Sequence, residues 1–272
     1  AGALVYLRAV ALAEGCVVPA PEEQGGGLYH HNWWNYYARG SFFLKQGRLR
    51  EATDDFQRSL GVLPGAKFGN THDMWRARTY GLHFVEGYFP NRELGVCFFE
   101  QQDYEQAIRY LESSLKQEPS GRAKHYLNLA FQKRLAGRAV PAPQLRLEGD
   151  VLPAVTGERV AVVAGAAEGA GRIARLDVAG RPEFIELAQP KLSFSRRVPL
   201  AAGTNVLMVS AVDLSGQRVV QRVVRIADWQ PPRLTVRRGE ARGGEWAVEA
   251  VCRDDFGLAE VRLGERVLFQ AK

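Results

Sequence analysis

The stretch YYARGSFFLKQ at residues 36–46 decides the fold of the first half of the chain, because a variant of it, NRELGVCFFEQ, returns 55 residues later at residues 91–101. Each copy places a glycine, Gly40 or Gly95, among apolar residues at helical spacing. A glycine on the packed face of a helix lets a second helix approach closely. The repeat therefore predicts two similar helical units.

A second helix is expected after each copy. Ala52 and Phe56 follow the first stretch, and Ala107 and Leu111 follow the second at the same spacing. We expect each alanine to face the glycine of the preceding helix, while the larger residue fills the groove beside it. Each unit is therefore predicted to be a pair of antiparallel helices.

The pattern of these pairs resembles the tetratricopeptide repeat (TPR). The resemblance implies an α-helical TPR solenoid over residues 28–140. Residues 126–130 resemble the first helix of a partial third unit, which would cap the solenoid. The positions that carry the resemblance in the first unit are Tyr36, Gly40, Phe43, Ala52, Phe56, Ser59 and Pro64.

The concave face of such a solenoid is the candidate site, because TPR domains bind partner segments on the face formed by their first helices. Tyr37 and Ser41 stand where TPR domains that bind peptide C-termini carry Lys and Asn, so the expected groove is aromatic and mixed in charge. The alternative is that Trp33, Trp34 and Tyr37 seal the N-terminal end of the solenoid. The partner-binding positions implied by the register are Trp34, Tyr37, Ser41, Lys45, Phe89, Arg92, Val96 and Glu100.

Residues 67–87 are inserted between the two repeats. Trp75, Tyr80 and Phe84 lie at near-helical spacing within this segment. The spacing predicts an extra helix over Thr71–Phe89 whose aromatic residues pack on the solenoid. A ligand site built from the same aromatic residues is the alternative.

After Pro141 the helical periodicity stops and alternation typical of β-strands begins. Phe194–Leu200 and Gly203–Asp213 resemble segments of bacterial immunoglobulin-like (Ig-like) modules. The resemblance implies an antiparallel Ig-like β-sandwich over residues 141–228. The expected strands are Leu145–Leu147, Arg159–Val163, Arg172–Val178, Leu192–Val198, Asn205–Val212 and Arg218–Ile226.

Residues 229–272 contain a second internal repeat, because Leu258–Phe269 aligns with Ile173–Phe184. This segment is predicted to be the first half of a second Ig-like module. Half a sandwich exposes strand edges and one side of its core. Either further sequence or a partner is expected to complete it.

The N-terminal segment, residues 1–27, is interpreted as a leader and tether. The residues before Cys16 resemble the end of a bacterial lipoprotein signal, which implies that Cys16 is lipidated. Arg8 and Glu14 depart from that pattern, and an amphipathic helix with an incidental cysteine is the alternative. Residues 19–27, PAPEEQGGG, are typical of a flexible tether.

The sequence shows no motif for catalysis, and neither a metal site nor a cofactor is expected. Its three cysteines are far apart, and its five histidines form no ligand pair at helical spacing. The net charge of +6 is divided evenly between the two halves, which disfavours nucleic-acid binding. Asp213, Asp254 and Asp255 lie in expected turns, where self-capping is favoured over Ca²⁺ binding.

These observations predict a multidomain α plus β chain, with an α-helical TPR solenoid followed by antiparallel Ig-like β-sandwich modules. The expected function is a non-catalytic protein–protein interaction scaffold of the bacterial cell envelope, periplasmic or at the cell surface. Its groove would bind a protein or peptide, and its β modules would act as spacer or docking surface. The alternative is the non-catalytic N-terminal part of an envelope peptidase or glycosidase. Sugar binding by the β modules is disfavoured, because residues 141–228 contain no Trp or Tyr.

Overall fold

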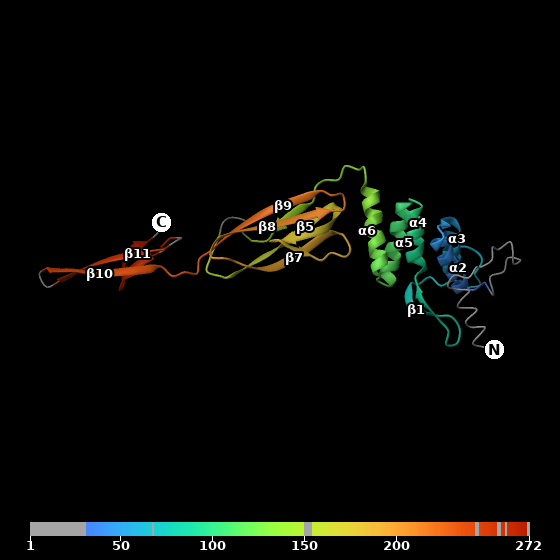
Figure 1. The fold of residues 1–272 in the computed structure, drawn as a ribbon, viewed down its shortest axis with the longest axis horizontal. Helices are drawn as coiled ribbons and strands as arrows, with labels where there is room; N and C mark the ends of the chain where they lie inside the picture. Colours follow the sequence, from blue (N-terminus) through green and yellow to red (C-terminus); the bar gives the residue numbers. More distant parts are fainter. Residues whose placement is uncertain are drawn as a thin grey trace.

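The structure is a computed structural model that describes residues 31–66, 68–149, 154–242, 245–254, 257–258 and 260–270. In Figure 1 the helices, the curled sheet and the C-terminal strands follow one another along the long axis. The helices are α2 (Trp33–Lys45), α3 (Leu49–Leu60), α4 (Pro90–Glu100), α5 (Tyr104–Gln117) and α6 (Gly121–Leu135). The strands are β1 (Met74–Arg78), β2 (Phe84–Tyr88), β3 (Gln144–Leu147), β4 (Ala154–Thr156), β5 (Val160–Val178), β6 (Arg181–Glu183), β7 (Gln189–Pro199), β8 (Gly203–Asp213), β9 (Arg218–Ala227), β10 (Arg233–Arg242), β11 (Glu245–Arg253), β12 (Glu260–Leu263) and β13 (Arg266–Gln270).

The two predicted helix pairs are present as α2–α3 and α4–α5. A Cβ placed on Gly40 would lie 3.1 Å from the ring of Phe56, and one on Gly95 would lie 2.5 Å from Cγ of Leu111. Both partner side chains are fully buried. The predicted close approach at the two glycines is therefore confirmed.

The predicted fold class is nevertheless wrong, because the helical part is not a TPR solenoid. The described residues hold only five helices, and strands make up more of their length than helices do. The two helix pairs are separated along the chain by the hairpin β1–β2, and the last helix meets the sheet. The repeat motif predicted the geometry within each pair, but it carried no information on the hairpin between the pairs or on the contact of the last helix with the sheet.

The segment predicted as an extra helix over Thr71–Phe89 is instead the antiparallel hairpin β1–β2. Arg78 pairs with Phe84, and Arg76 pairs with Glu86. Gly81 has φ +51°, in the left-handed region. Because glycine has no Cβ, it adopts this conformation in the tight turn without steric strain. Aromatic and β-branched residues favour strands, and this preference outweighed the near-helical spacing of the aromatic residues.

The seven-stranded sheet is curled around its own core because the two ends of the long strand β5 pair with different strands (Figure 1). Its first part pairs with β3 and β7, and its last part pairs with β6 and β8. The register shifts between Glu168 and Ile173, where Arg172 has φ +59°. The strands predicted at Arg159–Val163 and Arg172–Val178 are thus the two ends of one strand.

The predicted antiparallel Ig-like sandwich also needs correction. The seven strands form one connected sheet rather than two, and β4 runs parallel to β9. The core lies inside the curl, and buried residues of β5, β8 and β9 supply most of it. Its fully or almost fully buried members include Ile173, Leu176, Val178, Val209, Ala211 and Val223.

The predicted capping helix, α6, is a junction between the helices and the sheet. Asn128 Nδ2 donates to the carbonyl of Glu186, and Asn128 Oδ1 accepts from the backbone N–H of Ala188, both at 2.9 Å. The guanidinium of Arg172 stacks over the ring of Phe131 at 4.1 Å. Leu187 and Leu214 complete this contact by packing on the core of α5 and α6.

The C-terminal strands form two separate hairpins, β10–β11 and β12–β13, in which each strand pairs only with its hairpin partner. Apolar side chains such as Leu234, Val236 and Phe269 are exposed on them. Two-stranded hairpins bury little surface by themselves, so these strands contribute little to the core of the described chain.

Candidate binding surfaces

The face predicted to be an open groove is filled by the β1–β2 hairpin. The hydroxyl of Tyr37 donates to the carbonyl of Gly87 at 2.7 Å and accepts from the backbone N–H of Phe89 at 3.2 Å. The ring of Tyr88 packs against Trp33 and Tyr37, with centroid distances of 4.4 and 4.8 Å. The chain therefore occupies this part of the groove with its own residues.

The eight predicted groove residues consequently do not form one open site. Tyr37, Phe89 and Val96 are buried core residues, and their prediction as partner-binding residues is wrong. Burial raises the pKa of the Tyr37 phenol to about 12, as expected for a hydroxyl enclosed by the protein. The register placed these residues on the face of the first helices, but it did not reveal the hairpin that covers this face. Trp34, Ser41 and Arg92 are half-buried, and Lys45 and Glu100 are exposed.

Arg92 also has partners within the helical part. Its Nε donates to Glu93 at 2.7 Å, and its guanidinium lies 4.0 Å from the centre of the Phe89 ring. Arg122 forms a second ion pair with Glu93 at 3.3 Å. The predicted combination of an aromatic anchor at Tyr37 with an accessible cation at Arg92 is therefore not available to a partner.

Buried carboxylates in the helical part are used by the fold. Asp73 accepts hydrogen bonds from the backbone N–H groups of Asn91 and Arg92, at the start of α4. Burial raises the pKa of Asp73, and these hydrogen bonds only partly offset the effect. Asp55 forms ion pairs with Arg39 and Arg58. These contacts account for both acids without a catalytic role.

The turn aspartates cap their own turns, as predicted for Asp213 and Asp254. Asp213 Oδ1 accepts from the hydroxyl of Ser215 at 2.7 Å and from the backbone N–H of Gln217 at 2.9 Å. Asp254 Oδ1 accepts from the backbone N–H of Gly257 at 2.9 Å. Asp255 and Cys16 lie outside the described residues.

The described ranges contain no group of three or more His, Cys, Asp or Glu side chains placed to hold a metal ion. Within the same ranges, no helix is long and apolar enough to cross a membrane.

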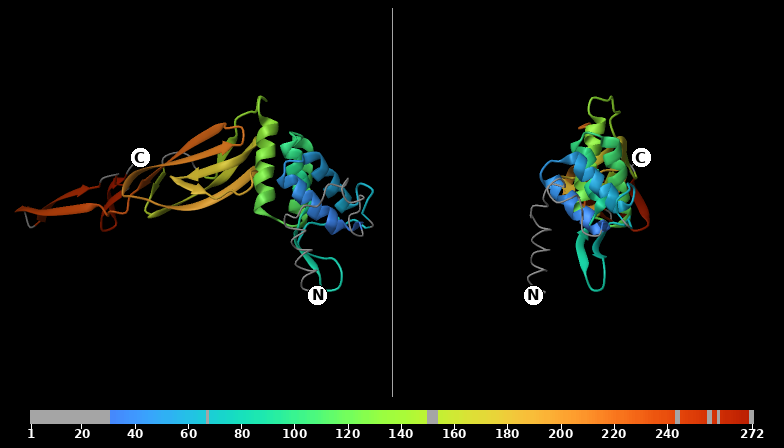
Figure 2. Two further views of the ribbon diagram at one scale, coloured as in Figure 1. Left: turned by 45° about the vertical axis from the view of Figure 1, so that its right-hand side comes forward. Right: turned by 90° about the vertical axis from the view of Figure 1, so that its right-hand side faces the viewer.

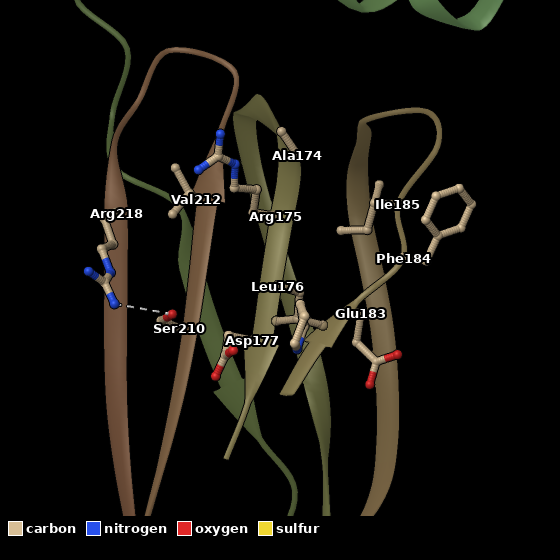
Figure 3. Close-up of a pocket in the computed structure, with 11 residues that line it drawn as sticks. Ala174, Arg175, Leu176, Asp177, Glu183, Phe184, Ile185, Ser210, Val212 and Arg218 are labelled. Atoms are coloured by element: carbon tan, nitrogen blue, oxygen red, sulfur yellow. Dashed lines mark hydrogen bonds between the residues drawn. The ribbon is translucent and has the colours of Figure 1, made fainter. Parts of the chain in front are cut away.

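A groove on the outer face of the curled sheet is a candidate site that the sequence did not indicate (Figure 3). It has a volume of about 510 Å³. One wall consists of residues on β5, β8 and β9, and the other follows β6 into the segment that contains Phe184 and Ile185. The side chain of Phe184 is 90% exposed.

The strand register explains which side chains line the first wall. Arg175, Val212 and Arg218 lie in one row across three strands. Asp177 and Ser210 lie in the next row. Arg218 reaches from the first row to this one and donates to the hydroxyl of Ser210 at 3.4 Å. In the first row, the apolar side chain of Val212 therefore lies between the cations Arg175 and Arg218, and paired strands hold all three in place.

An apolar stripe continues from this groove along β8 and β9. Val206, Met208 and Val220 are exposed on the outer face, whereas Val209 and Val223 point into the core. Met208 pairs with Arg222, which places a third arginine beside the stripe. We call these outward residues of the two strands the β8–β9 face. Apolar residues occupy both the inward and the outward positions of β8 and β9, and this pattern is the signal in the sequence that predicts an exposed apolar face.

No family model and no curated protein matches this chain. Three arginines border the β8–β9 face: Arg218 and Arg222 on β9, and Arg175 on the neighbouring strand β5. No ion pair joins any of them to an acidic side chain in the part of the chain that the structure describes.

Proposed function

We propose that this chain is a non-catalytic protein-interaction scaffold of the bacterial cell envelope, and that the β8–β9 face is its docking surface. The observation that carries the proposal is an exposed apolar stripe bordered by three arginines that lack acidic partners among the described residues. The partner that fits is an extended protein segment with acidic and aliphatic residues. No cofactor is part of this proposal.

The composition of the face favours such a segment over other partners. Exposed Val206, Met208 and Val220 offer apolar contact area, which a purely ionic ligand would leave in water. Arginine is enriched at binding hot spots, because its guanidinium pairs with carboxylates through two parallel hydrogen bonds. The groove beside Phe184 offers a place for one larger side chain of the partner.

The helical part acts in this proposal as a rigid support attached through α6. Asn128 and Arg172 both contribute to the α6 junction, so the helices and the sheet are connected by directional contacts as well as by the chain. Attachment to a membrane through Cys16, and assembly with other envelope proteins, are further parts of the proposal.

The experiment is a selection of binding peptides from a random library displayed on phage, with the purified full chain as bait. We expect enriched peptides to combine acidic and aliphatic residues. The double variant Arg175→Glu/Arg218→Glu should weaken binding of a selected peptide by about a hundredfold, since hot-spot arginines contribute roughly 1–2 kcal/mol each.

The matched control is Arg197→Glu/Arg237→Glu, which changes the net charge equally at two exposed arginines on other strands. It should bind the peptide like the original chain. Equal binding by all three proteins, or equal loss in both double variants, would remove the β8–β9 face as the docking surface.

A further inference from the structure

The β1–β2 hairpin projects from the helical part as a narrow element (Figure 2). Its turn carries the most exposed apolar side chain of the described residues, Leu82, which is 92% exposed. Tyr80 in the same turn is 64% exposed, and Trp75 further back on β1 is 56% exposed. Large apolar and aromatic side chains that gather on one exposed element mark a contact with a protein or a membrane more often than single exposed residues do.

The turn is ordered by hydrogen bonds from within the hairpin. The backbone N–H of Thr79 donates to the carbonyl of His83 at 3.0 Å, and Arg78 Nε donates to the carbonyl of Gly81 at 2.9 Å. The ring of Tyr80 stacks on His83 at a centroid distance of 5.0 Å. Leu82 is thus presented by a defined turn, so little conformational entropy is lost when it contacts a partner.

Along the hairpin, from its turn toward the helices, the side chains change from apolar to charged. Leu82 lies at the turn, and the polar rings of Tyr80 and His83 lie beside it. The next pair is Arg78 with Phe84, and the pair behind that is Arg76 with Glu86, whose side chains form an ion pair at 3.2 Å. With a rise of about 3.4 Å per residue, successive pairs of this kind are about 7 Å apart.

This order matches the layers of a bilayer surface. Interfacial protein segments bury their apolar groups roughly 5–10 Å into the boundary between headgroups and acyl chains. Tyrosine and tryptophan favour the headgroup level, and arginine is attracted by anionic lipid phosphates. A convex apolar turn that holds the guanidinium of Arg78 at its Gly81 carbonyl fits a surface at which apolar and phosphate layers adjoin.

We propose that the β1–β2 hairpin contacts an anionic membrane surface, with Leu82 and Tyr80 inserted at the headgroup boundary and Arg78 at the lipid phosphates. One leucine and one tyrosine give weak binding, so the hairpin acts as a second contact that orients a chain already held near the membrane. The inference is independent of the β8–β9 face and does not rest on the proposed peptide binding.

The test measures binding of the full chain to vesicles by flotation, using phosphatidylglycerol mixed with phosphatidylcholine and, separately, phosphatidylcholine alone. Leu82→Asp should lower binding to the mixed vesicles by about tenfold or more, because a fully exposed leucine that becomes buried contributes at least that factor. The matched control is Phe184→Asp, which replaces an equally exposed apolar residue on the sheet and should bind vesicles like the original chain. All proteins keep residues 1–30, so attachment through that segment is common to them.

A second variant, Leu82→Trp, reports insertion directly. Its additional fluorescence should shift to shorter wavelength on addition of mixed vesicles and should be quenched by lipids brominated near the headgroup. Binding should also be weaker to phosphatidylcholine alone and should fall with added salt. The proposal is overturned if Leu82→Asp and Phe184→Asp bind equally well, or if the added tryptophan is not quenched. It is also overturned if Leu82→Asp loses a protein partner while vesicle binding is unchanged, since the hairpin would then be a protein-docking element.

Discussion

At the scale of single residues, the two interhelical glycines set how closely each helix pair packs. A Cβ on Gly95 would lie only 2.5 Å from Leu111, whereas one on Gly40 would lie 3.1 Å from Phe56. We expect Gly95→Ala to destabilise the protein by about 2 kcal/mol, because overpacking forces the helices apart, and Gly40→Ala to cost less. Thermal unfolding measures both. Gly121→Ala is the control, since the nearest atom is 3.7 Å away; comparable losses in all three variants would contradict the packing argument.

Cys97 offers a second test at the residue scale. It is fully buried on α4, and burial raises the pKa of its thiol to about 12. Only the thiolate is a good nucleophile, so Cys97 should resist alkylation near pH 8 in the folded protein. Cys252 is partly exposed on β11 and should react first. Peptide mapping by mass spectrometry after iodoacetamide treatment distinguishes the two, and rapid labelling of Cys97 in the folded chain would contradict its burial.

At the scale of elements, the features that follow from the sequence are those set by residues close together in the chain. The close approach at Gly40 and Gly95 is encoded in a repeated motif and was predicted. The alternation that marked Asn205–Val212 and Arg218–Ile226 was also local, and β8 and β9 include these residues. The spacing of Trp75, Tyr80 and Phe84 fits a helix and a hairpin almost equally well. The strand preference of these aromatic residues and the turn at Gly81 together decide for the hairpin.

The hairpin also gives the element-scale prediction, because Tyr37 connects it to the helices by two hydrogen bonds. Tyr37→Phe removes both bonds and leaves the partly buried carbonyl of Gly87 and the buried N–H of Phe89 without that partner. We expect a loss of about 2 kcal/mol of stability, with faster hydrogen exchange concentrated in β1 and β2. Hydrogen exchange followed by mass spectrometry checks this. Unchanged exchange in residues 74–88 would show that the hairpin does not depend on the filled groove.

At the scale of the whole molecule, the contact between α6 and the sheet was beyond reach of sequence reasoning. Asn128 meets Glu186 and Ala188 about 60 positions later in the chain, and no local pattern marks such a contact. The same limit applies to the candidate site. The arginines at 175 and 218 come from different strands, and only the register of β5, β8 and β9 brings them into one row. Residues predicted from one helix register were instead covered by a distant segment.

The α6 junction leads to the final prediction, which concerns how the molecule unfolds. The backbone of Ala188 forms hydrogen bonds with both parts of the molecule. Its N–H donates to Asn128 on α6, and its carbonyl accepts from Nε of Arg172 on β5 at 3.0 Å. Because this connection and the Phe131 contact couple the helices to the sheet, residues 31–227 should unfold in one calorimetric transition. Asn128→Ala/Arg172→Ala removes these hydrogen bonds and the contact of Arg172 with Phe131, and it should split the single transition into two. Lys191→Ala/Arg197→Ala, at exposed positions on β7, should leave a single transition. Two transitions in the unaltered chain would mean that the helices and the sheet are energetically independent, and that the rigid support assumed for the β8–β9 face is absent.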